Sequence, residues 1–131
     1  MAKLTDEMKK MIGENQCFIA TVSSDGSPNV VPKRSTQVLD DDTLMFVEVT
    51  GKQTFQNLSA NPAVSIAVVN KDRNDGYRFN GKAELVKEGP LFDNVSKKLK
   101  EMGYPVPKAV VKVPLNEIYT MNPKRAGERI V

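Results

Sequence analysis

The sequence predicts a mainly β domain: a six-stranded antiparallel barrel flanked by short helices. Three observations predict this fold class. The 131 residues are close to the commonest size of a single domain, so residues 1–131 are expected to share one core. Short apolar and β-branched segments recur between clusters of turn residues, as in antiparallel strands. No repeat or linker interrupts them, and closure into a barrel would leave no exposed sheet edge.

The composition excludes several kinds of function. The chain has no histidine, which excludes Ser–His and Cys–His catalysis and a histidine-built metal site. The net charge is +3 and Lys and Arg are spread along the chain, so we expect no nucleic-acid partner. The apolar runs are far shorter than the roughly 20 residues that span a bilayer, and the N-terminus has no signal-peptide core. We therefore expect a cytoplasmic protein that does not bind membranes.

The chain opens with a short amphipathic helix. Apolar residues repeat at helical spacing over residues 4–12, Thr5 is placed as the N-cap, and Gly13 is placed as the stop. Cys17, the single cysteine, follows at the start of an apolar segment. Its neighbours predict a buried strand thiol rather than a nucleophile.

A meander of three strands follows the helix. The pattern predicts strands over residues 17–22, 28–38 and 44–49. Turn residues at 23–26 and 40–42 separate these strands. The sequence therefore predicts a hairpin extended by one further strand.

The middle of the chain predicts a helix and two more strands. A short helix begins after Gly51 and ends before Pro62. Residues 63–69 are small or β-branched, which is typical of a central strand buried on both faces. Residues 77–85 alternate between apolar and polar, which predicts a fifth strand with one wet face.

The last third predicts a helix, a strand and a tail. Residues 90–102 carry one apolar stripe that we expect to pack onto the sheet, and Gly103 closes the helix. Residues 109–121 are extended, with Pro114 at a bulge or edge. Residues 122–131 form an irregular basic tail.

The strongest local signal for chemistry is the turn Gly51, Lys52, Gln53 and Thr54, which leaves a strand and opens a helix. Such a turn offers free backbone N–H groups, the positive end of a helix dipole, a hydroxyl and an ammonium, which together suit a phosphate dianion. The alternative is an ordinary solvated helix start with a capping threonine.

A second cluster, Lys33, Arg34, Ser35 and Thr36, lies on the strand predicted over residues 28–38. Because side chains alternate along a strand, we expect Lys33 and Ser35 on one face and Arg34 and Thr36 on the other. One basic face would then converge with the Lys52 turn on a single anion. The alternative is a charged edge strand that discourages aggregation.

This order of elements resembles the pyridoxamine 5'-phosphate oxidase-like FMN-binding split barrels over nearly the whole chain. The resemblance rests on the opening helix, the hairpin FIATVSSDGSPNVVP, the basic segment KRST, and the stretches LMFVEVTGKQTFQNLSANPAVSIAV and EIYTMNPKRAGERI. Its most specific part is GKQTFQNLSANPAVSIAV. The resemblance implies a split β-barrel with FMN as its cofactor.

The resemblance also implies which residues hold the flavin. In that family the turn before the helix supplies Lys or Arg and Ser or Thr to the flavin phosphate; here these are Lys52 and Thr54, with Gln53 between them. A basic residue of the preceding strand joins them, either Lys33 or Arg34. Strand backbone is implied to run along the isoalloxazine ring at Ser35, Thr36, Val47 and Glu48.

Family members are usually homodimers with flavin sites at the interface, and a small barrel has few deep pockets of its own. The resemblance therefore implies a homodimer in which a partner's helix or C-terminal tail completes the site. Lys124 and Arg125 of the tail would reach a neighbouring site, or the tail is simply a frayed terminus.

The resemblance leaves several functions open. Pyridoxamine phosphate oxidases of the family hold their substrate with an arginine and histidine motif, and the absence of histidine argues against that activity here. Flavin carries the redox chemistry itself, so no catalytic side chain is required. The first hypothesis is a flavin-dependent oxidoreductase acting on a small organic substrate or a nicotinamide donor. The alternatives are a non-enzymatic FMN electron carrier and a relative that binds a deazaflavin.

Overall fold

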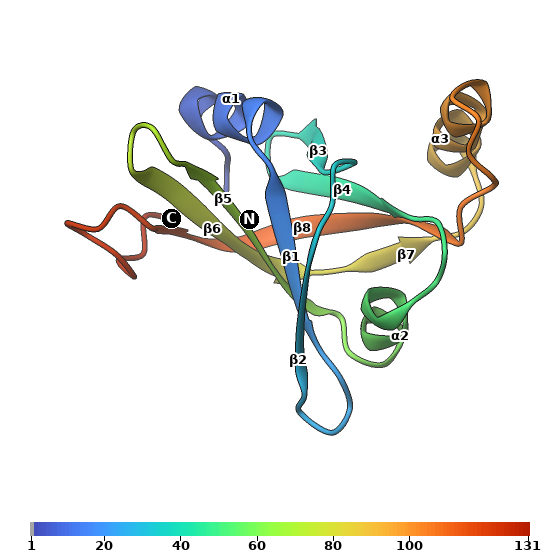
Figure 1. The fold of residues 1–131 in the computed structure, drawn as a ribbon, viewed down its shortest axis with the longest axis horizontal. Helices are drawn as coiled ribbons and strands as arrows, with labels where there is room; N and C mark the ends of the chain where they lie inside the picture. The colour runs from blue at the N-terminus through green and yellow to red at the C-terminus, as the bar shows by residue number, and fades with distance from the viewer. Residues whose placement is uncertain (1) are drawn as a thin grey trace.

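The computed structural model describes residues 2–131, which form three helices and eight strands (Figure 1). The helices are α1 (Asp6–Glu14), α2 (Gln53–Ala60) and α3 (Pro90–Glu101). The strands are β1 (Cys17–Val22), β2 (Pro28–Pro32), β3 (Gln37–Asp40), β4 (Thr43–Glu48), β5 (Ala63–Asn70), β6 (Asp75–Lys82), β7 (Glu84–Val86) and β8 (Ala109–Thr120). Every strand pair of this region is antiparallel, which confirms the predicted fold class.

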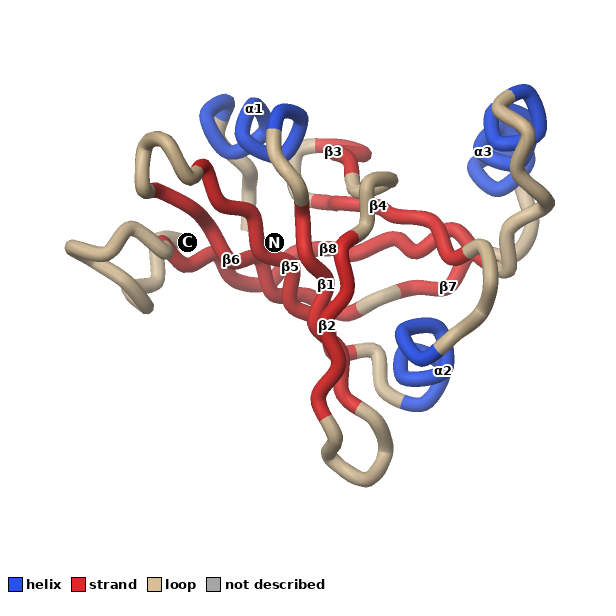
Figure 2. Tube along the Cα trace, in the orientation of Figure 1, coloured by secondary structure: helices blue, strands red, loops and turns tan. Residues whose placement is uncertain are grey.

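The strands form one open sheet in the order β2-β1-β5-β6-β8-β4-β3, with β7 paired to β8 off this path. The long strand β8 joins the two halves of the sheet: one part of it pairs with β6, and the other pairs with β4 and β7. Figure 2 shows how the two halves curve around a shared interior. The expectation of a closed barrel is wrong, because β2 and β3 end the path without pairing among residues 2–131. The barrel is split.

Two predicted strands are interrupted, which is why the described residues hold eight strands instead of six. The strand predicted over residues 28–38 breaks at a turn in which the Thr36 N–H and hydroxyl both donate to the Lys33 carbonyl, at 3.2 and 2.8 Å. The strand predicted over residues 77–85 breaks at Ala83, whose N–H donates to the Pro62 carbonyl at 2.7 Å instead of to β8. Both breaks depend on specific hydrogen bonds that alternation cannot reveal.

Helices α1 and α2 pack against the main core, whereas α3 packs on the opposite face of β4 and β8. Helix α1 begins as predicted, since the Thr5 hydroxyl accepts a hydrogen bond from the Met8 N–H at 3.2 Å, and its apolar residues enter the main core. Helix α3 lies at the periphery (Figure 1) and contacts a smaller cluster around Met45, Val47 and Val110 with half-buried residues. No helix within residues 2–131 has the length and apolar character required to cross a bilayer.

The outer face of β2, β1 and β5 is apolar and uncovered in the single chain. In β5, Val64, Ile66 and Val68 point into the core, whereas the residues between them are exposed or half-buried. The prediction that residues 63–69 are buried on both faces is therefore wrong for one copy of the chain. Phe18, Val30 and Val69 are 45%, 63% and 48% exposed on this face. We call this surface, formed by the outward residues of β2, β1 and β5, the outer sheet face.

Candidate functional site

A groove of about 170 Å³ lies where β2 ends, β4 ends and α2 begins. It brings together residues that are far apart in the sequence. Five of the residues predicted to bind the cofactor line it: Lys33, Glu48, Lys52, Gln53 and Thr54. The basic turn after β2 and the turn before α2 thus face one depression.

The start of α2 leaves its backbone donors free. Lys52 occupies the N-cap position in an extended conformation, and no side chain caps the helix. The first N–H groups of a helix have no partner within the helix, so this end presents donors and a positive dipole to the groove. No acidic residue lies in the first turn. Lys52 itself is exposed, and these features together make the position suitable for an anion.

Thr54 is not the capping residue that the alternative interpretation requires. It lies one residue inside the helix, is buried, and accepts a hydrogen bond from Asn29 Nδ2 at 3.2 Å. Its hydroxyl proton is therefore available to a ligand in the groove. Two amides fix the helix itself: the buried Asn57 donates from Nδ2 to Thr21 Oγ1 at 3.0 Å, and the exposed Gln53 donates from Nε2 to Asn57 Oδ1 at 2.6 Å.

Gly51 sets the direction in which the chain leaves β4. Its φ of +68° lies in the left-handed region, which favours glycine. A Cβ at this position would lie 3.2 Å from Cγ of Lys108, so the lysine stem packs directly over the glycine. The Lys108 N–H donates to the Glu48 carbonyl at 2.7 Å and ties this segment to the end of β4. The glycine thus permits the close packing that shapes the turn.

Glu48 is the most unusual residue of the groove. It is only 2% exposed, yet it carries a carboxylate, and its Oε2 accepts a hydrogen bond from the Lys33 ammonium. A buried charge requires such a partner, because an isolated carboxylate in an apolar interior is strongly unfavourable. Lys33 is therefore held by Glu48 within the groove.

The other members of the basic segment lie elsewhere. Arg34, Ser35 and Thr36 line a neighbouring depression of about 530 Å³ between the end of α1 and the turn after β2, and Lys33 borders both this depression and the groove. The predicted alternation of faces is wrong, because residues 33–36 form a turn and not a strand. The Ser35 hydroxyl accepts a hydrogen bond from the Val47 N–H at 2.9 Å, so this backbone donor already has a partner. The structure places Lys33, and not Arg34, beside the Lys52 turn.

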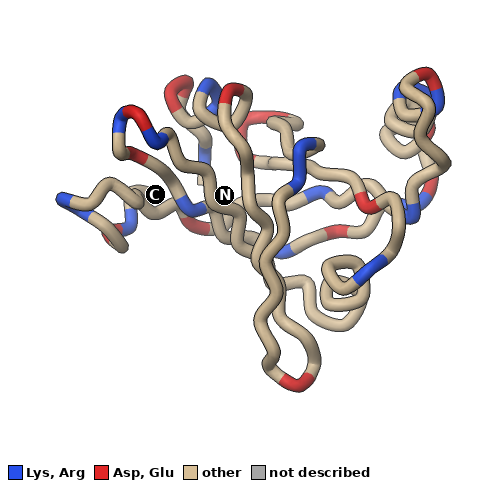
Figure 3. The backbone as a smooth tube through the Cα atoms, viewed as in Figure 1, with Lys and Arg blue, Asp and Glu red and all other residues tan. Residues whose placement is uncertain are grey.

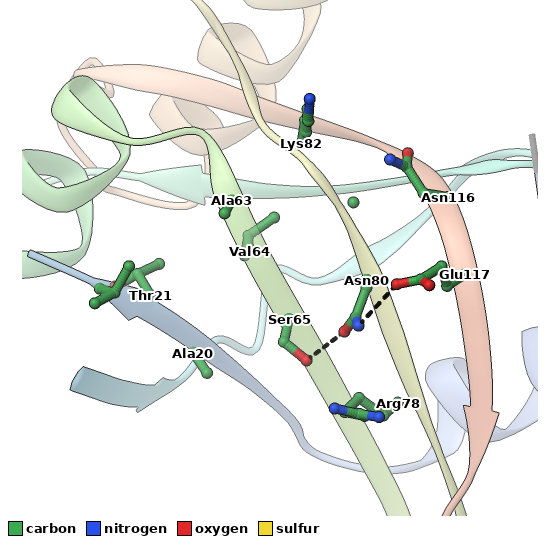
Figure 4. Close-up of a pocket in the computed structure, with 12 residues that line it drawn as sticks. Ala20, Thr21, Ala63, Val64, Ser65, Arg78, Asn80, Lys82, Asn116 and Glu117 are labelled. Carbon is green, nitrogen blue, oxygen red and sulfur yellow. Dashed lines mark hydrogen bonds between the residues drawn. The ribbon is translucent and has the colours of Figure 1, made fainter. Parts of the chain in front are cut away.

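A third depression, of about 460 Å³ and more open than the groove, lies beside the outer sheet face (Figure 4). Ser65 Oγ donates to Asn80 Oδ1 at 2.8 Å, and Asn80 Nδ2 lies 3.4 Å from Glu117 Oε1. The Tyr119 hydroxyl donates to Glu117 at 3.0 Å; this bond lowers the pKa of Glu117 and raises the pKa of Tyr119. The Arg78 guanidinium lies 4.2 Å from the centre of the Tyr119 ring. A positive group, Arg78, and a negative group, Glu117, therefore border the apolar face.

The comparisons with known proteins identify the family. The family model of pyridoxamine 5'-phosphate oxidase matches residues 4–124. The chain belongs to the pyridoxamine 5'-phosphate oxidase family. HupZ of Group A Streptococcus is similar to it, with 35% identity, a TM-score of 0.85, and coverage of 95% of this chain and 98% of that one.

Two further proteins are similar to this chain, one in sequence and one in fold. An uncharacterized protein of Methanocaldococcus jannaschii, MJ0282, is 35% identical over 127 residues, which cover 92% of this chain and 83% of the relative. An FMN-binding protein of Syntrophomonas wolfei shares the fold at 20% identity and a TM-score of 0.75, over 88% of this chain and 84% of that one. A protein described as FMN-binding therefore has the same fold as this chain.

Sequence reasoning missed groove residues that the fold brings in from a distance. Asn29 and Val31 enter from β2, and Thr50 from the turn before α2. Asn29 could have been found from the hairpin register, because it sits opposite Thr21, which anchors α2 through Asn57. No local signal marks Lys108, since its place over Gly51 depends on the path of the chain after α3.

Proposed function

We propose that this chain binds FMN with its phosphate in the groove at the start of α2, and that it is a flavin-dependent oxidoreductase. The observation that carries the proposal is the uncapped start of α2, which leaves backbone donors beside an exposed Lys52 and the buried Thr54 hydroxyl. This donor set fits a phosphate dianion. Figure 3 shows that basic positions are scattered over the molecule, so the groove is defined by local geometry more than by net charge.

The flavin, when bound, supplies the hydride or electron transfer with a small organic substrate or a nicotinamide donor. The residues of this chain need only bind and orient it. Lys52 and the first N–H groups of α2 would hold the phosphate, and Thr54 would donate its hydroxyl proton. The chain lacks histidine, so we expect no oxidation of pyridoxamine phosphate by the arginine–histidine chemistry of the vitamin-processing enzymes.

The groove alone is too small for the whole cofactor, which supports a homodimer. Ligand pockets usually measure roughly 300–1,000 Å³, whereas this groove measures about 170 Å³. The outer sheet face offers the matching wall: it is apolar, and Arg78 and Glu117 at its border carry opposite charges that a second copy could pair. We propose that two copies meet on this face and that each completes the other's flavin site.

The proposal is tested by identifying the bound chromophore. The purified protein is denatured, and the released compound is identified by its mass and absorbance. Release of FMN supports the proposal. Release of a deazaflavin would show that the cofactor is a deazaflavin and not FMN. A colourless protein that gives no saturable signal on titration with FMN would overturn it. Steady-state turnover with NADH or NADPH then identifies an enzyme, whereas exchange with other redox proteins alone indicates an electron carrier.

A further inference from the structure

The ion pair between half-buried Lys33 and buried Glu48 lies inside the groove that we assign to phosphate. A carboxylate is an unexpected neighbour for a phosphate, because two anions at close range repel. Glu48 is 2% exposed, so it cannot simply turn into solvent. We therefore expect Glu48 to interact with the ligand, with Lys33, or with both.

One oxygen of Glu48 remains open to a ligand. Oε2 accepts from Lys33 Nζ, and among residues 2–131 no donor hydrogen-bonds to Oε1. Oε1 is not sealed in the core either, since Ser96 Oγ is the one sealed and unpartnered side-chain oxygen among those residues. Glu48 lines the groove together with Lys52 and Thr54, so its carboxylate borders the space that a bound phosphate ester would enter.

The groove thus combines donors for an anion with one strong acceptor. An ionised carboxylate accepts hydrogen bonds and offers none, so its natural ligand partner is a hydroxyl or an N–H group. Bonds to a charged acceptor are roughly twice as strong as neutral ones. A ligand that satisfies both parts of the groove carries a phosphate together with a hydroxyl group a few bonds away.

We propose that Glu48 is a specificity-determining residue that selects phosphate monoesters with a neighbouring hydroxyl group. Oε1 accepts a hydrogen bond from that hydroxyl, while Oε2 keeps Lys33 as its counter-ion. Phosphates without a hydroxyl leave Oε1 unpaired beside an anion, and they are disfavoured. This inference rests on the proposed function, because the polyol chain of FMN places hydroxyl groups next to its phosphate.

The test compares two flavin phosphates. One is FMN, and the other carries an unsubstituted pentyl phosphate chain in place of the ribityl phosphate. Dissociation constants are measured by quenching of flavin fluorescence for the wild type and for Glu48→Gln. We expect the wild type to bind FMN about ten- to a hundredfold more tightly than the pentyl analogue, the range of one charge-assisted hydrogen bond.

Glu48→Gln should reduce this preference about tenfold or more, because it weakens the binding of FMN and strengthens the binding of the pentyl analogue. FMN loses a bond to a charged acceptor, and the analogue gains a Lys33 freed from its counter-ion. A purely structural defect would instead weaken both ligands by the same factor. The matched control is Glu101→Gln, which removes the same charge from an exposed position of α3 and should leave the preference unchanged. If Glu48→Gln fails to fold, the double variant Lys33→Gln with Glu48→Gln, which buries no charge, is used in its place.

Three outcomes are decisive. A preference that collapses in the Glu48 variant supports the proposal. A wild type that binds both flavins equally, or a Glu48 variant that keeps the full preference, overturns the role of Glu48 but leaves FMN binding intact. A wild type that binds neither compound overturns the proposed function and the role of Glu48 together.

Discussion

The ion pair between Lys33 and Glu48 makes a strong prediction about stability. Replacing Lys33 by Met would leave the Glu48 carboxylate buried without its cation. Removing one partner of a fully buried pair costs about 3–5 kcal/mol. The Lys33 side chain is 23% exposed, so water would screen part of the loss and the low end of that range applies. We therefore expect Lys33→Met to lower the free energy of unfolding by about 3 kcal/mol.

The double variant Lys33→Met with Glu48→Gln isolates the cause. It removes both charges, and it should recover most of the lost stability, because a hydrogen-bonding amide costs far less to bury than an unpaired carboxylate. For a domain of this size the single variant should melt about 10 °C below the wild type. Urea unfolding followed by circular dichroism measures all three proteins. Lys33→Met with wild-type stability, or a double variant as unstable as the single one, would show that the pair is not buried as described.

Three further predictions concern the fold and the assembly. Gly81→Ala should destabilise the protein by about 2 kcal/mol or more in urea unfolding, because the added Cβ would lie 2.3 Å from the Pro114 carbonyl oxygen. The control is Gly13→Ala, which should be neutral or stabilising because no atom lies within 4 Å of the added Cβ. Cys17 should resist thiol reagents at neutral pH until the protein unfolds, because burial raises its pKa to about 11; rapid labelling of the native protein would contradict this. Phe18→Asp should give a stably folded monomer in light scattering, with weakened FMN binding, since Phe18 is 45% exposed on the outer sheet face; a dimer that survives this change would place the interface elsewhere.

The sequence was most informative where local chemistry decides the structure. The helix that follows Thr5 and the helix that ends before Pro62 match α1 and α2, because capping residues and helix breakers act over a few residues. The turn at Gly51 was predicted for the same reason, and its positive φ requires a residue of this kind. A fold class built from such elements can be predicted without knowing any long-range contact.

The predictions failed where distant segments decide the outcome. The break after β2 is supported by the bond between Ser35 Oγ and the Val47 N–H, twelve positions away in the chain. Strand alternation predicted two opposite faces for Lys33 and its neighbours, but residues in a turn do not alternate in this way. The burial of Glu48 could not be predicted either, since its counter-ion comes from another part of the sheet. The outer sheet face looked like core in the sequence because its residues are apolar, and the single chain does not cover it.

The measurement that tests the central claim most directly compares FMN with riboflavin, which lacks the phosphate, in the wild type and in Lys52→Ala. The account predicts that the wild type prefers FMN and that Lys52→Ala weakens FMN binding by about 1.5–3 kcal/mol while leaving riboflavin binding nearly unchanged. Equal affinity of the wild type for the two flavins, or an undiminished preference in Lys52→Ala, would contradict the claim that the start of α2 holds the phosphate.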